Sequence, residues 1–137
     1  MKYFIAEIFL IVPSLLQAQS KPVKIVFDVT SKDTLTHQAV LRHVSGMAEA
    51  YPDALLEVVI YGGAWPMVVA GKSTRVNDVA RLANQKNISF KICAITMERF
   101  NIEDNELVKG VEVVPDGIIE IVTLQNEGWG YIKESHN

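Results

Sequence analysis

The residue of this 137-residue chain best suited to do chemistry is Cys93, its only cysteine. A single cysteine has no partner for an internal disulfide, so its sulfur is a reactive thiol, a link to another molecule or a buried apolar group. The segment 89–94 predicts a short strand that ends at this residue, and Thr96 is typical of a residue that caps a following helix. Because the free N–H groups at a helix N-terminus favour negative charge, Cys93 is a candidate nucleophile.

Which residues lie beside Cys93 depends on where the other predicted strands end. In open α/β sheets, ligands bind beyond the carboxyl ends of the strands, and three predicted strands end in distinctive segments, at 28–31, 61–65 and 93–97. The paired glycines suit a tight turn with close backbone approach or an ordinary loop, and the indole suits a pocket or an oligomer interface. We expect these segments to converge on a pocket whose candidate binding residues are Gly62, Gly63, Trp65, Thr96 and Met97.

Other motifs fail on their spacing. The segment 71–73, Gly-Lys-Ser, resembles the end of a phosphate-binding loop, but Pro66 occupies the place of the first glycine, which excludes nucleotide hydrolysis by this motif. His37 and His43 are six residues apart on one predicted helix and therefore point from different faces. We expect both histidines to be solvated, and we predict no metal site because no histidine pair has metal-ligand spacing.

The alternation of strand and helix patterns predicts the fold that positions these residues. Asp33 or Thr34 can cap the first helix, and the segment 115–117, Pro-Asp-Gly, opens the last one. This order predicts an α/β fold of flavodoxin-like type, a single domain with three layers and a mostly parallel five-stranded sheet flanked by helices. The five predicted strands are 23–30, 55–61, 89–94, 111–114 and 129–133.

The composition supports one globular domain and excludes one class of partner, nucleic acid. A chain of this length suits a single core, and its 49% hydrophobic and 21% charged residues are close to globular averages. The formal net charge of -3, without any run of lysine or arginine, provides no positive field for a phosphate backbone. We therefore expect no nucleic-acid partner.

The first 20 residues have the layout of a secretory signal peptide, with Lys2, an apolar stretch at 3–16 and small or polar residues at 17–20. The stretch is shorter than the ~20 apolar residues that a spanning helix needs, so we expect no permanent membrane anchor. We predict cleavage of 1–20, leaving a domain at 21–137 in the periplasm or outside the cell. The alternative is an N-terminal helix that packs on the domain, which the charged Glu7 favours.

From Lys21 onward, the chain resembles the DsrE/DsrF-like family of small sulfur-relay proteins, in its uncharacterised single-domain subgroup. The most specific segments are 93–97, Cys-Ala-Ile-Thr-Met, and 110–115, Gly-Val-Glu-Val-Val-Pro. The resemblance implies homotrimers or homohexamers and no cofactor. It also implies that Cys93 accepts sulfur as a persulfide and passes it on, in exchange with a donor or acceptor protein or a small thiol.

Two departures from the family pattern qualify this resemblance. Family members often have His-Gly-Pro-Gly after the second strand, whereas segment 61–64 here is Tyr-Gly-Gly-Ala, so that histidine cannot assist the thiol. The family's relays work in the cytoplasm, and an exported member would need another donor and acceptor. We expect an exported, oligomeric sulfur carrier or sulfurtransferase that uses Cys93. The alternative is a non-catalytic oligomer that binds a small ligand or acts as a scaffold, with a structural cysteine.

Overall fold

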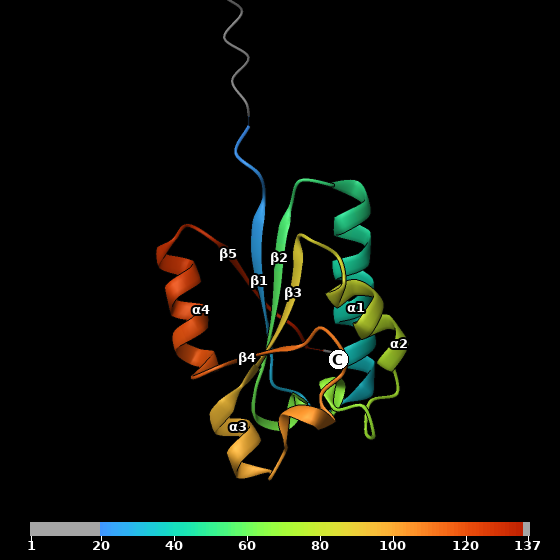
Figure 1. Cartoon of the computed structure of the whole chain (residues 1–137). Coiled ribbons are helices and arrows are strands. Elements are labelled where there is room, and N and C mark those ends of the chain that lie inside the picture. Colours follow the sequence, from blue (N-terminus) through green and yellow to red (C-terminus); the bar gives the residue numbers. More distant parts are fainter. Residues whose placement is uncertain (1–19, 136–137) are drawn as a thin grey trace, which may run out of the picture.

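The computed structural model describes residues 20–135, so the predicted signal peptide lies outside the described residues except for Ser20. Five strands form one sheet in the order β4-β3-β2-β1-β5, and every neighbouring pair is parallel (Figure 1). The prediction of a mostly parallel five-stranded sheet is therefore confirmed. The strands are β1 (Lys24–Val29), β2 (Leu55–Ile60), β3 (Ile88–Cys93), β4 (Glu112–Val114) and β5 (Gly130–Lys133).

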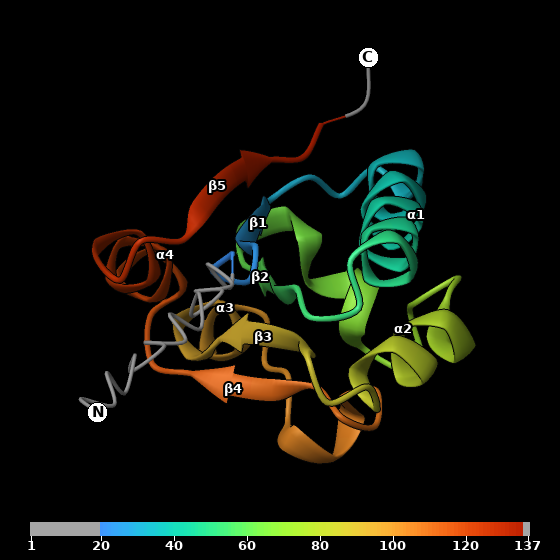
Figure 2. The same cartoon turned by 90° about the horizontal axis from the view of Figure 1, so that it is seen from above.

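Helices cover the sheet from both sides. In Figure 2, α1 and α2 lie on one face and α4 lies on the other, which gives the three layers that the sequence predicts. The short α3 lies beyond the carboxyl ends of the strands. The α-helices are α1 (Thr34–Ala50), α2 (Val76–Ala83), α3 (Ala94–Arg99) and α4 (Gly117–Asn126), and two 3-10 helices are η1 (Gly62–Val68) and η2 (Asp104–Glu106). Among the described residues, no helix is long and apolar enough to cross a membrane.

Aspartate side chains fix the starts of the two helices for which the sequence predicts them. The Asp33 carboxylate accepts a hydrogen bond from the Leu35 N–H at 2.9 Å, and Asp116 accepts from the N–H groups of Ile118 and Ile119. Each carboxylate satisfies backbone donors that the helix itself leaves free. The predicted cap at Asp33 and the predicted start of the last helix are confirmed.

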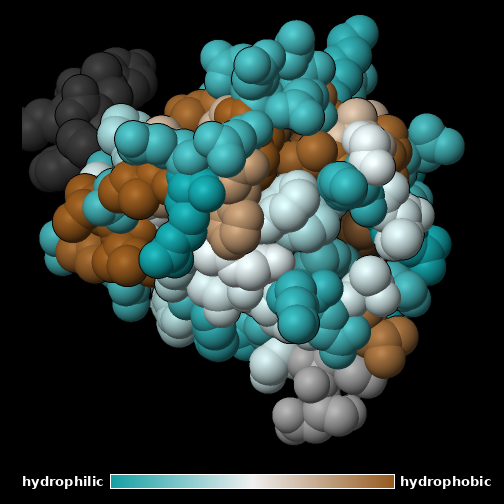
Figure 3. Space-filling model, turned by 90° about the horizontal axis from the view of Figure 1, so that it is seen from below, coloured by the Kyte–Doolittle hydropathy of each residue, from teal (hydrophilic) through white to brown (hydrophobic). Residues whose placement is uncertain are grey.

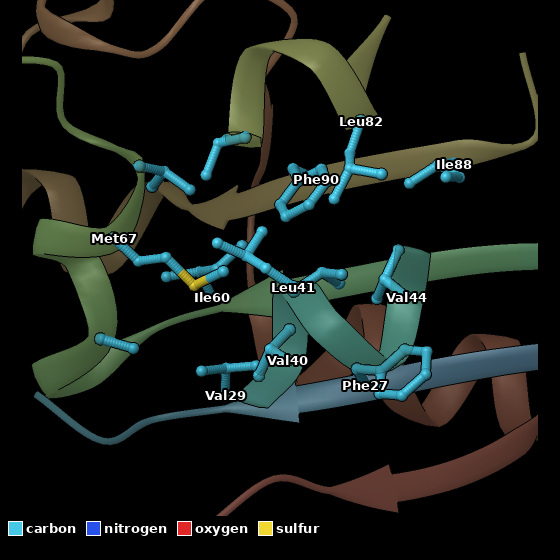
Figure 4. Close-up of a cluster of buried hydrophobic side chains, with 14 of the residues drawn as sticks. Phe27, Val29, Val40, Leu41, Val44, Ile60, Met67, Leu82, Ile88 and Phe90 are labelled. Carbon is cyan, nitrogen blue, oxygen red and sulfur yellow. The ribbon is translucent and has the colours of Figure 1, made fainter. Parts of the chain in front are cut away.

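The two faces of the sheet bury very different amounts of apolar surface. Figure 4 shows the larger cluster, in which side chains from β1, β2 and β3 pack against α1, α2 and η1. On the α4 side, the buried apolar cluster consists of Val26, Val59, Ile121 and Leu124. Because burial of one such side chain contributes roughly 1.5–3 kcal/mol, α4 is held far less firmly than α1.

Two expectations about individual residues are wrong. The third helix begins at Ala94 rather than at Thr96, and Cys93 itself is the residue that precedes it. His37 is not solvated, because the first turn of α1 places it in the interior, where its Nε2 lies 2.7 Å from the carbonyl oxygen of Ser31. His43 is exposed to solvent as expected, and its Nδ1 lies 2.7 Å from the carboxylate of the buried Glu134.

Candidate functional site

Cys93 lies at the carboxyl end of β3 and is the N-cap residue of α3. Its backbone is extended, with φ -71° and ψ 124°, and its side chain makes no capping hydrogen bond. The side chain is not on the surface, since only 5% of the residue is exposed. The thiol thus occupies the predicted edge of the sheet, but beneath other residues.

The start of α4 covers Cys93. A Cβ atom added to Gly117, the first residue of α4, would lie 3.2 Å from Cβ of Cys93. The same atom would lie 3.3 Å from Val59 Cγ1 and 3.4 Å from Tyr61 Cδ1. Glycine therefore allows the helix to approach the thiol, and Gly117 belongs to the site although the sequence pattern indicates only a helix start.

The predicted binding glycines pack against the other two strand ends. The Gly62 N–H donates a hydrogen bond to Thr96 Oγ1 at 2.9 Å, so Thr96 joins η1 to α3 instead of capping a helix. Gly62 has a φ of +57°, which glycine adopts without strain. A Cβ atom on Gly63 would come within 3.0 Å of the carbonyl oxygen of Thr30. The three segments do converge, as the sequence predicts.

The two remaining predicted site residues lie elsewhere. Met97 is 6% exposed and belongs to the main apolar core, so its sulfur does not line a pocket with Cys93. Trp65 is half-buried and packs against Phe100, with 5.5 Å between the ring centroids. Both positions follow from α3 folding back onto η1, a contact that local sequence patterns do not reveal.

A second polar group lies on the same face of the sheet, at the adjacent carboxyl ends of β1 and β5. Asp28 is buried, and its carboxylate accepts hydrogen bonds from Tyr131 Oη at 2.5 Å and Lys133 Nζ at 3.2 Å. Lys133 Nζ also donates to Thr30 Oγ1 at 2.7 Å and lies 5.9 Å from the centre of the Tyr61 ring. Strand order reverses between β1 and β5, which is where open α/β sheets bind ligands.

Burial and the Asp28 carboxylate perturb both tyrosines. Burial, together with the nearby negative charge, raises the pKa of Tyr61 to about 12. For Tyr131, the hydrogen bond to Asp28 is the main cause of a pKa that is also raised to about 12. Both phenols therefore keep their protons well above neutral pH, and Tyr131 donates its proton in the hydrogen bond to Asp28.

A buried carboxyl group lies farther down the same face. Glu57, in the middle of β2, is 6% exposed and accepts a hydrogen bond from Ser89 Oγ at 3.0 Å through one oxygen. Its other oxygen has no hydrogen-bond partner among the described residues. Burial and the neighbouring carboxyl group of Glu120 raise the pKa of Glu57 to about 7. The apolar run 55–60 contains this single charged residue, which is the signal that sequence reasoning missed.

The outer side of α4 is apolar. Figure 3 views the molecule from the carboxyl ends of the strands, and apolar side chains gather over α4 at the left. Ile118, Ile119 and Val122 are 56%, 59% and 46% exposed. Side chains of this kind in neighbouring turns of one helix are typical of a surface that another protein covers.

Two hollows lie away from Cys93, on either side of α1. An apolar one of about 520 Å³ lies between α1 and β5 and is bordered by Met47 and Ile132. A more polar one of about 510 Å³ lies between α1 and α2 and contains Arg42, Arg75 and Arg81. Among the described residues, no cluster of histidine, cysteine or carboxylate side chains could hold a metal ion.

The fold and the site together define a small parallel α/β protein with one cysteine at the carboxyl edge of its sheet. The chain belongs to the DsrE/DsrF-like family, whose model matches residues 24–133. The family is associated with sulfur relay, and the resemblance seen in the sequence is confirmed. Comparison with curated proteins found no match.

Solved structures of similar proteins support the same fold. A protein of unknown function from Methanobacterium thermoautotrophicum, MTH1491, has a TM-score of 0.75 at 26% identity, over 81% of this chain and 98% of its own. The ychN protein from E. coli has a TM-score of 0.68 at 16% identity, over 83% and 99% of the two chains. BT1422 from Bacteroides thetaiotaomicron, also of unknown function, has a TM-score of 0.64 at 14% identity, over 80% and 93%.

Proposed function

We propose that this protein is a sulfur carrier in which Cys93 accepts a sulfur atom as a persulfide and passes it on. The observation that carries the proposal is the position of Cys93 as the last residue of β3 and the N-cap of α3, in a family associated with sulfur relay. Its side chain makes no capping bond, so the N–H groups of the first turn of α3 are available to a negatively charged sulfur.

The transfer step is a thiol–disulfide type of exchange. The Cys93 thiolate attacks the outer sulfur of a donor persulfide, R–S–SH, and a new S–S bond forms as the donor S–S bond breaks. The donor leaves as R–S⁻ with the electron pair of the broken bond, so the step needs no external oxidant or reductant. Transfer to an acceptor thiolate repeats the exchange and restores the Cys93 thiolate.

Two further features support an exported location and an oligomeric assembly for this carrier. The signal-peptide layout of residues 1–20 supports export to the periplasm or beyond. The exposed apolar side chains of Ile118, Ile119 and Val122 support a homo-oligomer, a trimer or hexamer, in which a second copy covers α4. An exported carrier would exchange sulfur with a donor or acceptor protein or a small thiol of that compartment.

A second candidate function is a non-catalytic oligomer that binds a small ligand or serves as a scaffold. The burial of Cys93 under Gly117 favours it, because a sealed sulfur behaves as a small apolar side chain. In this case, Cys93 matters only for packing.

Mass spectrometry of the intact protein separates the two functions. The protein is incubated with inorganic polysulfide at pH 8, and the carrier gains roughly 32 Da, one sulfur atom, as persulfidation requires. Cys93→Ser is the matched control and gains nothing. If the native protein gains no mass while the urea-unfolded protein does, the thiol is sealed and the structural alternative holds.

A further inference from the structure

A single helix packs against Cys93 on one face of the sheet. Within residues 20–135, α4 is the one helix on this face, as Figure 2 shows, and its first residue lies against Cβ of Cys93. Below α4, the apolar contact is small, since Ile121 and Leu124 meet only Val26 and Val59 as fully buried neighbours. Within one subunit, an element held by so few buried contacts opens more readily than the core beneath α1, and in the proposed oligomer its opening also has to release the copy that covers its outer side.

Under the middle of α4 lies a carboxyl group that the fold does not satisfy. Glu57 is buried at 6% exposure, and one of its oxygens has no hydrogen-bond partner among the described residues. A buried carboxylate oxygen without a donor is costly, whereas a protonated carboxyl group can donate to a second carboxylate. The group positioned to accept is Glu120 on α4, which lies one turn after Gly117 and interacts with Glu57.

We propose that α4 is a proton-controlled cover over Cys93, held closed by a proton shared between Glu57 and Glu120. With the proton present, the two carboxyl groups bind one another and α4 is seated with Gly117 on the thiol. Without it, two negative charges face one another in a buried space, α4 loosens and the thiol is uncovered. The proposal rests on the proposed function in one respect, since a cover regulates activity only if Cys93 reacts.

Other charges that face this pair modify the control without removing it. Lys91 on β3 favours the ionised form of Glu57, but its Nζ lies 2.9 Å from a carboxylate oxygen of Glu112 on β4, which partly neutralises it. On β1, the same face carries Asp28, whose charge is compensated by Tyr131 and Lys133. When the shared proton is lost, the main new force on α4 is therefore the repulsion between Glu57 and Glu120.

The direction of the effect follows from the raised pKa of Glu57. In the closed state the group releases its proton near pH 7, and in an open, solvated state near 4.5. Between pH 4.5 and pH 7, the closed state binds one proton more than the open state. The open fraction therefore rises roughly tenfold per pH unit in this range and levels off above pH 7. Between pH 5.5 and pH 8, the expected increase in opening is roughly 30-fold.

Two measurements on the full-length protein test the proposal. Hydrogen exchange reports the opening of α4 through its backbone amides, and maleimide labelling reports the exposure of the Cys93 thiol. Each rate at pH 5.5 and pH 8 is divided by the rate of Glu57→Gln at the same pH, which cancels the intrinsic pH dependence of both reactions. Glu120→Gln is a second variant that removes the pair from the α4 side. Glu127→Gln, at the exposed C-cap of α4, is the matched control.

The expected result is a roughly 30-fold rise of both normalised rates in the wild type and in Glu127→Gln. Glu120→Gln should show little or no rise. If the normalised exchange of α4 does not change with pH, the carboxyl pair does not control the helix and the proposal fails. If α4 exchange rises but Cys93 labelling does not, α4 is not its cover and the proposal also fails. If both rise and polysulfide still adds no sulfur, the cover stands and the carrier function falls.

Discussion

Gly117 lies directly against Cys93, because a Cβ atom added to the glycine would come within 3.2 Å of Cβ of the cysteine. This contact joins residues from different layers of the fold. It makes the reactivity of the cysteine a property of how α4 is seated, not only of the strand on which the cysteine lies.

Replacing Gly117 by alanine should destabilise the protein even though alanine is the better helix former. The added Cβ would lie 3.2 Å from Cβ of Cys93, so Cys93 or α4 has to give by a few tenths of an ångström. We expect a loss of roughly 1–3 kcal/mol in the free energy of unfolding, as overpacking of a tight contact produces. Urea unfolding monitored by circular dichroism measures it.

Gly46→Ala is the matched control for this substitution. Gly46 lies inside α1, and a Cβ atom there would meet nothing within 4 Å. Alanine should therefore raise the free energy of unfolding by roughly 0.5–1 kcal/mol. If Gly117→Ala gained as much stability as Gly46→Ala, α4 would not press on Cys93.

Replacing Thr96 by valine should weaken the connection between η1 and α3. Valine keeps the shape of threonine but leaves the Gly62 N–H without its acceptor at 2.9 Å. The expected cost is roughly 1–3 kcal/mol in urea unfolding, because a partly buried donor loses its partner. Thr96→Ser keeps the hydroxyl and should retain most of the stability, and a valine variant as stable as the serine variant would contradict this assignment.

Tyr61 and Tyr131 should ionise near pH 12 in an ultraviolet absorbance titration. Because the folded protein favours the neutral phenols, the stability that they contribute below pH 10 is lost as the pH rises from 10 to 12. Asp28→Asn removes the negative charge and should move both pKa values toward 10. Asp53→Asn changes an exposed carboxylate and should move neither.

The stability of the protein should fall as the pH rises from 4.5 to 7. The pKa of Glu57 is raised from 4.5 to about 7, so the folded state binds a proton that the unfolded state has released. The loss in the free energy of unfolding is at most about 3 kcal/mol, since each pKa unit corresponds to about 1.4 kcal/mol. Glu57→Gln should abolish this slope in urea unfolding, and a slope that persists in that variant would assign it to other groups.

The sequence was sufficient to predict most of the fold because local patterns determine it. Runs of branched apolar residues gave the strands, and Asp33 and Asp116 marked helix starts through hydrogen bonds to residues two or three positions away. The convergence of the strand ends near Cys93 also followed, since parallel strands place their carboxyl ends at one edge.

The site was harder to predict because its decisive contacts join distant segments. Cys93 and Gly117 are brought together only when α4 packs on the sheet, and no spacing rule reports whether a thiol is covered. Likewise, the Glu57 carboxyl group meets Glu120 across two elements. The closeness of Met97 to the cysteine in sequence predicts a place in the pocket, yet the turn of α3 directs its side chain into the core.

The pairing of β1 with β5 ties the beginning of the domain to its end. The two partners of the Asp28 carboxylate, Tyr131 and Lys133, follow it by 103 and 105 positions, so during synthesis its charge has neither partner until β5 has been made. A nascent or truncated chain that lacks β5 would leave the Asp28 carboxylate without either of these partners. The pairing of β5 with β1 therefore completes the described sheet and supplies both partners of this carboxylate in the same step.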